Sequence, residues 1–186
     1  MIELSGKVAI VTGSSRGIGK AIALSMARAG AEVVVSSRKI EPCEAVASEI
    51  TEGGGKAHAI ACNVSDKSQL ESLVAETVEK CGGIDVIVCN AAANPSYGPM
   101  RELEDGAFEK IMTTNVQSNL WLANLAAPSM IERGGGAMVL IASIAGFGGS
   151  RSLGAYAVSK AAQLQLARNL AIEWGRKGIR ANCIAP

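Results

Sequence analysis

The sequence has 186 residues, enough for one sizeable hydrophobic core but short for two domains. It carries 18 basic and 17 acidic residues, so it lacks the basic excess that binds nucleic acid or anionic lipid. There is no run of about 20 apolar residues, as a membrane span requires, and no signal peptide is evident. We therefore expect one soluble, cytoplasmic domain, with an organellar matrix as the alternative location.

The cysteines and the single histidine argue against disulfides and metals. The five cysteines are odd in number and show no Cys-x-x-Cys spacing, so we interpret them as free and mostly buried. His58 is the only imidazole, and the sequence indicates no cysteine or carboxylate that converges on it. We expect no metal site.

Short apolar segments alternate with longer helical patterns. We expect strands at 8–12, 32–36, 57–61, 86–89, 137–142 and 180–184, and helices at 17–29, 42–52, 67–81, 108–130 and 156–176. Strands that are apolar throughout, such as VAIVT and AMVLIA, favour a parallel sheet covered on both faces. We predict an α/β, three-layer, doubly wound Rossmann-type fold with strand order 3-2-1-4-5-6. Ligands bind such sheets at the carboxyl ends of the strands.

A glycine-rich loop follows the first strand and precedes a helix. Its glycines permit a tight turn and a close approach of pyrophosphate, and the helix N-terminus offers free N–H groups. The alternative is a purely structural turn. The residues expected to contact the pyrophosphate are Gly13, Ser15, Arg16, Gly17, Ile18 and Gly19.

The end of the second strand indicates which dinucleotide binds. NAD-binding proteins place a carboxylate here, whereas an arginine accommodates the 2′-phosphate of NADP. This chain has Ser37, Arg38 and Lys39 and no acid, and Arg16 could reach the same phosphate. We predict NADP(H) as the cofactor. The alternative is that Arg38 and Lys39 are only a solvated pair.

Three residues form a candidate catalytic group. Ser143 ends the fifth strand, and Tyr156 and Lys160 share one face of the following helix because they are four residues apart. A cation beside a phenol favours the phenolate, which makes Tyr156 usable as a general acid or base. Taken singly, each residue could be an ordinary helix or strand-end residue.

The glycine loop and the Tyr-x-x-x-Lys pair resemble those of the short-chain dehydrogenases/reductases, in particular NADP-dependent carbonyl and 3-oxoacyl reductases. The resemblance covers the whole chain. It implies that Tyr156 exchanges the proton, that Lys160 binds the nicotinamide ribose and lowers the tyrosine's pKa, and that Ser143 hydrogen-bonds the substrate oxygen. It also implies that Asn115 belongs to a water relay.

The resemblance further implies that Asn63 and Val64 flank the adenine and that Asn90 and Ala91 line the cofactor. Two features depart from the family. The chain has Cys-Asn-Ala-Ala at 89–92, where the family usually has Asn-Asn-Ala-Gly. It also ends at Pro186, where family members continue into a substrate lid and a seventh strand, so we expect residues 1–186 to be a single, C-terminally incomplete dinucleotide-binding domain.

These observations predict an oxidoreductase that transfers hydride between NADP(H) and a small-molecule carbonyl or secondary alcohol. One alternative is a catalytically impaired nucleotide-binding or oligomerisation module, because the lid is missing. Another is an epimerase or dehydratase, since the fold hosts both. The resemblance implies that the helices at 108–130 and 156–176 pair between subunits, giving a homodimer or homotetramer.

Overall fold

A six-stranded parallel sheet forms the centre of the computed structural model, which describes residues 3–186. The strands are β1 (Val8–Thr12), β2 (Glu32–Ser37), β3 (Lys56–Ala61), β4 (Val86–Cys89), β5 (Gly136–Ile141) and β6 (Ile179–Ile184). Their order is β3-β2-β1-β4-β5-β6, and every neighbouring pair is parallel. The predicted fold class and strand order are confirmed.

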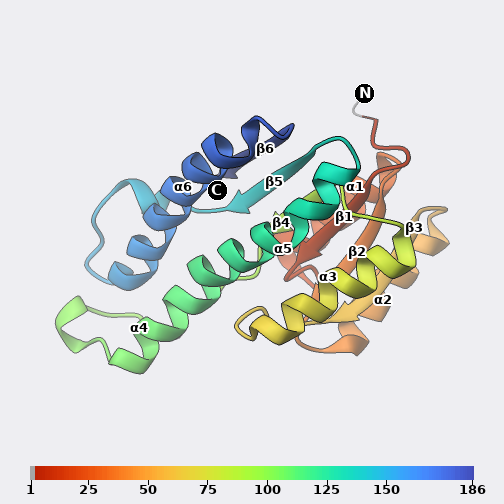
Figure 1. The fold of residues 1–186 in the computed structure, drawn as a ribbon. Coiled ribbons are helices and arrows are strands. Elements are labelled where there is room, and N and C mark those ends of the chain that lie inside the picture. Colours follow the sequence, from red (N-terminus) through yellow and green to blue (C-terminus); the bar gives the residue numbers. More distant parts are fainter. Residues whose placement is uncertain (1–2) are drawn as a thin grey trace.

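Helices cover the sheet unequally (Figure 1). The helices α1 (Gly17–Arg28) and α2 (Ile40–Glu52) pack on one face, and α3 (Lys67–Cys81), α5 (Ser118–Glu132) and α6 (Gly154–Gly175) pack on the other. This division follows from right-handed crossovers, because the strand order changes direction between β3 and β4. Because of this reversal, the carboxyl ends of β1 and β4 lie side by side. The segment after β1 continues towards one face of the sheet, and the segment after β4 continues towards the other.

The helical stretch expected over 108–130 is present, but it is not a single α-helix. The structure has α4 (Asp105–Met112), a π-helical turn η2 (Thr113–Gln117) and then α5. A π-turn widens the backbone spiral locally, and such turns are frequent at functional sites. The remaining expected elements agree with the structure to within two residues at each end, and the short 3₁₀ turns η1 (Met100–Glu102) and η3 (Ile144–Phe147) complete the described elements.

One face of β6 is open among the described residues. Its side chains alternate between buried and exposed, with Ile179 and Ala181 inside and Arg180 and Asn182 outside. None of the helices in residues 3–186 packs on the outward side chains. Nor does any of these helices have the length and apolar character needed to cross a membrane.

The expectation that nothing converges on His58 is wrong. His58 of β3 hydrogen-bonds Glu32 of β2 at 2.7 Å, and Cys81 at the end of α3 lies close to both. The register explains the first contact, since Glu32 pairs with Lys56 and His58 lies two residues further along the same face. The sequence did not indicate this contact because Glu32 and His58 are 26 residues apart, and only the pairing of β2 with β3 brings them together.

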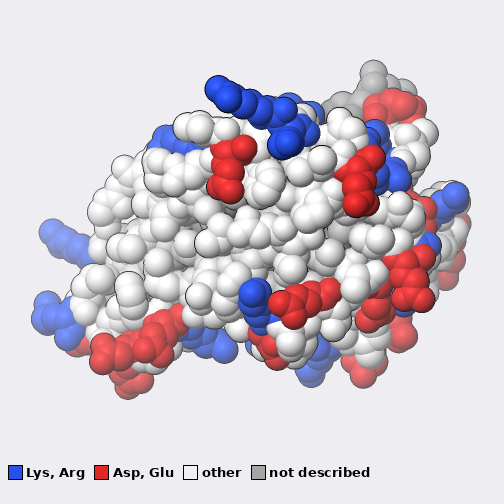
Figure 2. All heavy atoms as spheres, in the orientation of Figure 1, with Lys and Arg blue, Asp and Glu red and all other residues white. Residues whose placement is uncertain are grey.

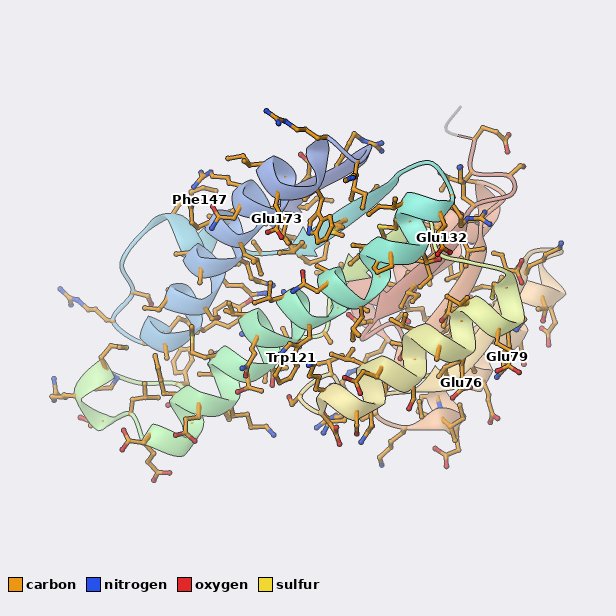
Figure 3. All side chains as sticks on the ribbon, viewed as in Figure 1. Glu76, Glu79, Trp121, Glu132, Phe147 and Glu173 are labelled. Atoms are coloured by element: carbon orange, nitrogen blue, oxygen red, sulfur yellow. The ribbon has the colours of Figure 1, made fainter. Side chains whose placement is uncertain are left out.

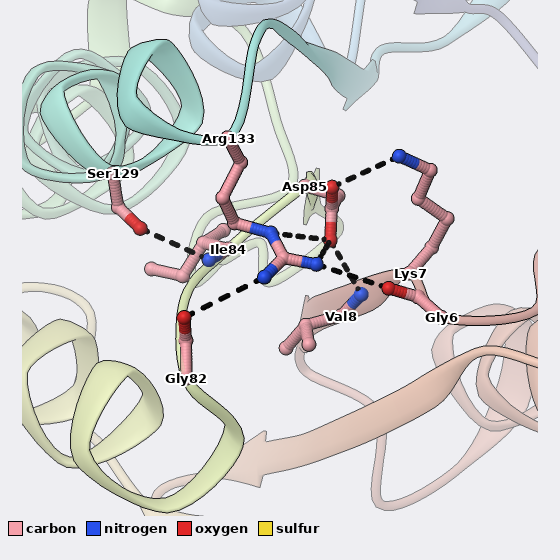
Figure 4. Close-up of polar contacts among 8 residues, drawn as sticks. All are labelled: Gly6, Lys7, Val8, Gly82, Ile84, Asp85, Ser129 and Arg133. Carbon is pink, nitrogen blue, oxygen red and sulfur yellow. Dashed lines mark hydrogen bonds and ion pairs between the residues drawn. The ribbon is translucent and has the colours of Figure 1, made fainter.

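A buried carboxylate ties the amino end of the sheet together (Figure 4). Asp85, which is 3% exposed, accepts hydrogen bonds from the Val8 N–H at 2.9 Å, Lys7 Nζ at 3.2 Å and Arg133 Nε at 3.0 Å. Arg133 Nη2 also donates to the Gly6 carbonyl at 3.0 Å. One side chain thus joins the start of β1, the start of β4 and the end of α5.

The same contacts set the ionisation of Asp85. Burial alone would raise its pKa, but hydrogen bonds from Arg133, Val8 and Lys7 outweigh burial and hold the pKa below its ordinary value of 3.8. A carboxylate whose folded-state pKa is lowered stabilises the fold above its unfolded pKa. That stability is lost as the pH falls through the lower, folded value.

We predict that Asp85→Asn lowers the free energy of unfolding by about 1–3 kcal/mol near pH 7, because the charged hydrogen bonds are lost. The difference from the parent protein should be complete above about pH 5 and should shrink below about pH 4. Denaturant unfolding at several pH values measures it. The control is Glu79→Gln on the exposed side of α3, labelled in Figure 3, which should change stability little. A gap that persists unchanged at pH 3 contradicts the role of the Asp85 charge.

Candidate active site

A cleft of about 940 Å³ opens at the carboxyl ends of the strands around β1 and β4. Most of the residues that the sequence predicts for cofactor binding line it. They are Gly13, Ser15, Arg16, Ser37, Arg38, Lys39, Asn63, Val64, Asn90 and Ala91. The structure therefore brings together segments that lie up to 78 residues apart in the chain.

Five predicted cofactor residues do not line this cleft. Gly17, Ile18 and Gly19 form the first turn of α1, where Ile18 is 52% exposed. Tyr156 and Lys160 lie on α6, which follows β5 rather than β1. The cleft and the candidate catalytic residues are thus adjoining parts of one edge of the sheet, contributed by different βα units.

Hydrogen bonds between β1 and β4 hold the floor of the cleft. Thr12 Oγ1 accepts from the N–H groups of Asn90 at 3.1 Å and Ala91 at 3.2 Å, and it donates to the Val88 carbonyl at 3.2 Å. Asn90 Nδ2 in turn donates to the carbonyls of Thr12 and Gly13, both at 3.0 Å. Sequence reasoning had missed Thr12 as a site residue. Its position as the last residue of an apolar strand beside the glycine loop was the available signal.

Two glycines of the loop, Gly13 and Gly19, leave no room for side chains. Gly13 has φ of +64°, and a Cβ there would lie 2.9 Å from Ala91 Cα and from Asn90 Nδ2. A Cβ on Gly19 would overlap the Gly13 carbonyl and Asn90 Nδ2. The bare backbone brings the first turn of α1 against β1 and β4, which is the arrangement that lets a pyrophosphate approach main-chain N–H groups.

The N-terminus of α1 is electrostatically prepared for an anion. Arg16 is its N-cap residue, no side chain caps the helix, and the first turn contains no acid. The uncapped N–H groups and the helix dipole therefore present positive charge to the cleft. Ser14, a second residue that sequence reasoning missed, fixes the loop from within. Its hydroxyl donates to the Val11 carbonyl at 2.6 Å and accepts from the Ser36 N–H at 2.9 Å.

Positive side chains gather where β2 ends. Arg16, Arg38 and Lys39 are all exposed and line the cleft, and none forms a salt bridge within residues 3–186. Lys110 of α4 lines the same cleft. Since the cleft lining contains no aspartate or glutamate, these cations are available to a negatively charged ligand.

Tyr156 and Lys160 meet as their spacing predicts. Lys160 Nζ lies 5.3 Å from the centre of the Tyr156 ring and donates a hydrogen bond to the Ile141 carbonyl at 2.7 Å. Lys160 is only 2% exposed, and this burial lowers its pKa to about 8, against a weaker opposing effect of Cys183. At neutral pH the ammonium is still the major form, so Tyr156 has a buried cation beside it.

Ser143 lies at the end of β5 and caps the short turn η3. Its hydroxyl accepts from the Ala145 N–H at 3.3 Å. The turn packs tightly on α6, because a Cβ on Gly146 would lie 2.9 Å from the main-chain carbon of Lys160. Ser143 is therefore anchored to the helix that carries Tyr156 and Lys160.

Asn115 lies in the π-turn, and its side chain connects two segments of the site by hydrogen bonds. Its Oδ1 accepts from the Ala93 N–H at 2.8 Å, and its Nδ2 donates to the Ala93 carbonyl and to Ser159 Oγ, both at 3.0 Å. The Asn119 amide donates to the Asn115 carbonyl at 2.7 Å. The side chain expected in a water relay thus makes three hydrogen bonds to protein groups, and it joins the loop after β4 to α6 beside Lys160. Ser159, between the two motif residues, was not predicted to take part.

The comparisons with known proteins agree on one family. A family model described as short chain dehydrogenase matches residues 7–186. "Dehydrogenase/reductase SDR family member 4" of Oryctolagus cuniculus is 41% identical over 183 residues, which cover 98% of this chain and 70% of the rabbit protein. The human "Dehydrogenase/reductase SDR family member 2, mitochondrial" is 42% identical over 183 residues, 98% of this chain and 65% of its own length. The chain belongs to the short chain dehydrogenase family.

Solved structures with the same architecture include a 7 alpha-hydroxysteroid dehydrogenase complexed with NADH and 7-oxo glycochenodeoxycholic acid. It matches with a TM-score of 0.96 and 38% identity over 100% of this chain and 72% of its own. A hydroxysteroid dehydrogenase from Escherichia coli matches with a TM-score of 0.93 and 38% identity over 100% of this chain and 76% of its own. Since the family match runs from residue 7 to residue 186, it includes both the glycine loop and the Tyr156–Lys160 pair.

Proposed function

We propose that this short chain dehydrogenase transfers hydride between NADP(H) and a carbonyl or secondary alcohol. The observation that carries the proposal is the Tyr156 ring beside the buried Lys160 ammonium, on the same edge of the sheet as the cleft beside the glycine loop. The curated relatives are named dehydrogenases or reductases, and a solved neighbour holds NADH. The chain spans 65–70% of those relatives, so its activity is inferred from the site it contains.

The cleft suits a dinucleotide. The side-chain-free contact of Gly13 and Gly19 with Asn90 and the uncapped N-terminus of α1 would hold the pyrophosphate. Arg38 and Lys39, with Arg16 opposite, would bind a 2′-phosphate, for which guanidinium groups are well matched. Asn63 and Val64 would flank the adenine, and Asn90 and Ala91 would line the path towards α6. When bound, the nicotinamide supplies or accepts the hydride.

The residues of the chain handle the proton and the substrate oxygen. Tyr156 would donate its phenolic proton to the oxygen of a carbonyl that is being reduced, and Ser143 would donate a second hydrogen bond there. Two donors stabilise the negative charge that develops on this oxygen. Lys160 would contact the nicotinamide ribose and favour the phenolate left on Tyr156. Asn115 and Ser159 would keep the loop after β4 in register with α6 while this occurs.

The surface over α5 and α6 supports a homodimer or homotetramer. Figure 2 shows that charged residues lie mainly towards the rim of the viewed face, while its centre over α5 and α6 is largely uncharged. Glu132 and Glu173, labelled in Figure 3, lie on the viewed face above this uncharged centre. Leu120 of α5 is 39% exposed and Ile172 of α6 is 80% exposed. A partner subunit would cover such apolar surface.

We further propose a cytoplasmic or organellar-matrix location and a small-molecule substrate.

We predict that Tyr156→Phe lowers the turnover number by at least about 100-fold, because it removes the phenolic proton that Tyr156 would deliver to the substrate oxygen. The affinity for NADPH should stay within about threefold, since the hydroxyl contributes little to dinucleotide binding. Loss of reduced-nicotinamide absorbance with a panel of ketones gives the rate, and a fluorescence titration gives the affinity.

Tyr97→Phe is the matched control, because it removes the other tyrosine hydroxyl of the chain from a residue that is 78% exposed. Its rate should equal that of the parent protein. Turnover retained by Tyr156→Phe would refute the role of Tyr156. A parent protein that binds NADPH but turns over no carbonyl would instead favour a nucleotide-binding module.

We predict that Arg38→Asp reverses the cofactor preference, because it replaces the cation at the 2′-phosphate by a carboxylate suited to a ribose hydroxyl. The ratio of NADPH to NADH affinity should fall by at least about 100-fold, close to 3 kcal/mol. Calorimetric titrations with both dinucleotides measure this ratio. Arg28→Asp makes the same charge change at the end of α1, outside the cleft, and should leave the ratio unchanged. Equal ratios in the two variants would contradict the assignment of Arg38.

A further inference from the structure

Three donor side chains converge at the edge of the sheet opposite the cleft. They are Glu32 at the start of β2, His58 on β3 and Cys81 at the end of α3. One ligand atom of each lies within 4.8 Å of the other two, and His58 Nε2 is 2.7 Å from Glu32 Oε1. The mechanism proposed above uses none of them.

The fold itself creates this cluster. Glu32 and His58 project from the sheet face that α3 covers, because Glu32 is level with Lys56 and side chains alternate along each strand. The helix α3 runs back over this face and ends at Cys81, where Gly82 in the left-handed conformation stops it. Each donor therefore sits on a regular element, and such elements position ligands more firmly than loops do.

The donor set is one that zinc-type cations prefer. Thiolate sulfur, imidazole nitrogen and carboxylate oxygen are the usual zinc ligands, and three protein ligands leave a fourth position for water. Tetrahedral coordination needs ligand atoms about 3.3–3.8 Å apart, so Glu32 and His58 would have to separate from 2.7 Å, and any wider spacing, up to 4.8 Å, would have to close. One carboxylate and one thiolate would balance the charge of a divalent ion. The thiol proton would pass to solvent.

The side chains of the cluster are partly buried but can be reached from solvent. The side chains of His58 and Glu32 are 34% and 24% exposed. Glu32 and Cys81 also line a cavity of about 480 Å³ on this edge, which gives an ion and its remaining water a route of entry. Burial first, and then the neighbouring Glu32, raise the pKa of the Cys81 thiol to about 11, while Lys80 opposes this. A bound cation would reverse that effect, since coordination deprotonates a thiol.

We propose that Glu32, His58 and Cys81 form a binding site for a divalent cation of the zinc type, separate from the dinucleotide cleft. Such an ion would tie β2, β3 and the end of α3 together at the amino end of the sheet. The competing interpretation is an ordinary Glu32–His58 ion pair with a thiol nearby, which would bind no metal.

Titration of the full chain with Co²⁺, after removal of bound metal with a chelator, tests the proposal. We expect one equivalent to bind and to give both a thiolate-to-cobalt charge-transfer band in the near ultraviolet and the visible bands of tetrahedral cobalt. Zn²⁺ should abolish both by displacement. At a hundredfold excess over its Kd, Zn²⁺ should raise Tm by roughly 5–10 °C. A parent protein that gives no charge-transfer band overturns the proposal without any variant being needed.

Variants assign the ligands. Cys81→Ser should lose the charge-transfer band, and His58→Gln, which can keep a hydrogen bond to Glu32, should weaken Co²⁺ binding at least about tenfold. Cys183→Ser removes another half-buried thiol and should change neither the band nor the affinity. Bands that survive Cys81→Ser, or that Cys183→Ser removes, would place the metal elsewhere. Because the readouts are spectra and Tm, they do not depend on whether the cleft binds NADP(H).

Discussion

The junction between the ends of β1 and β4 is the constraint on which the cleft depends. The strand order reverses there, so the chain leaves β1 towards one face of the sheet and β4 towards the other. Thr12 and Asn90 hold the two exits together through hydrogen bonds to each other's main chain. Without them, the part-buried Ala91 N–H would lose its hydrogen bond to Thr12, and the glycine loop would lose the Asn90 amide that binds the Gly13 carbonyl.

The part of the site that carries Tyr156 and Lys160 is held in place by a second set of contacts. Asn115 binds both main-chain groups of Ala93 and reaches Ser159 on α6, so the loop that leaves β4 is fixed to the helix that carries Tyr156. Lys160 is fixed separately by the Ile141 carbonyl at the end of β5. Its burial costs stability, and it keeps the ammonium beside the phenol rather than in solvent.

Local patterns were enough to predict the fold and most of the cleft. Short stretches of sequence contain the apolar strands, the glycine positions and the i, i+4 spacing of Tyr156 and Lys160. The π-turn around Asn115 was not predictable, because the sequence there is compatible with a continuous α-helix. The roles of Thr12 and Ser14, and the approach of Glu32 and Cys81 to His58, depend on strand register and helix length, which no short window of sequence contains.

The central claim is that the β1–β4 junction frames a dinucleotide site, and Thr12→Val tests it most directly. This nearly isosteric change removes the hydroxyl that accepts from Asn90 and Ala91. Calorimetric titration should show NADPH affinity reduced at least about tenfold. Thr77→Val, at a threonine that is equally buried but bonds only within α3, should leave it unchanged. Affinity within twofold of the parent protein in both variants would contradict the account.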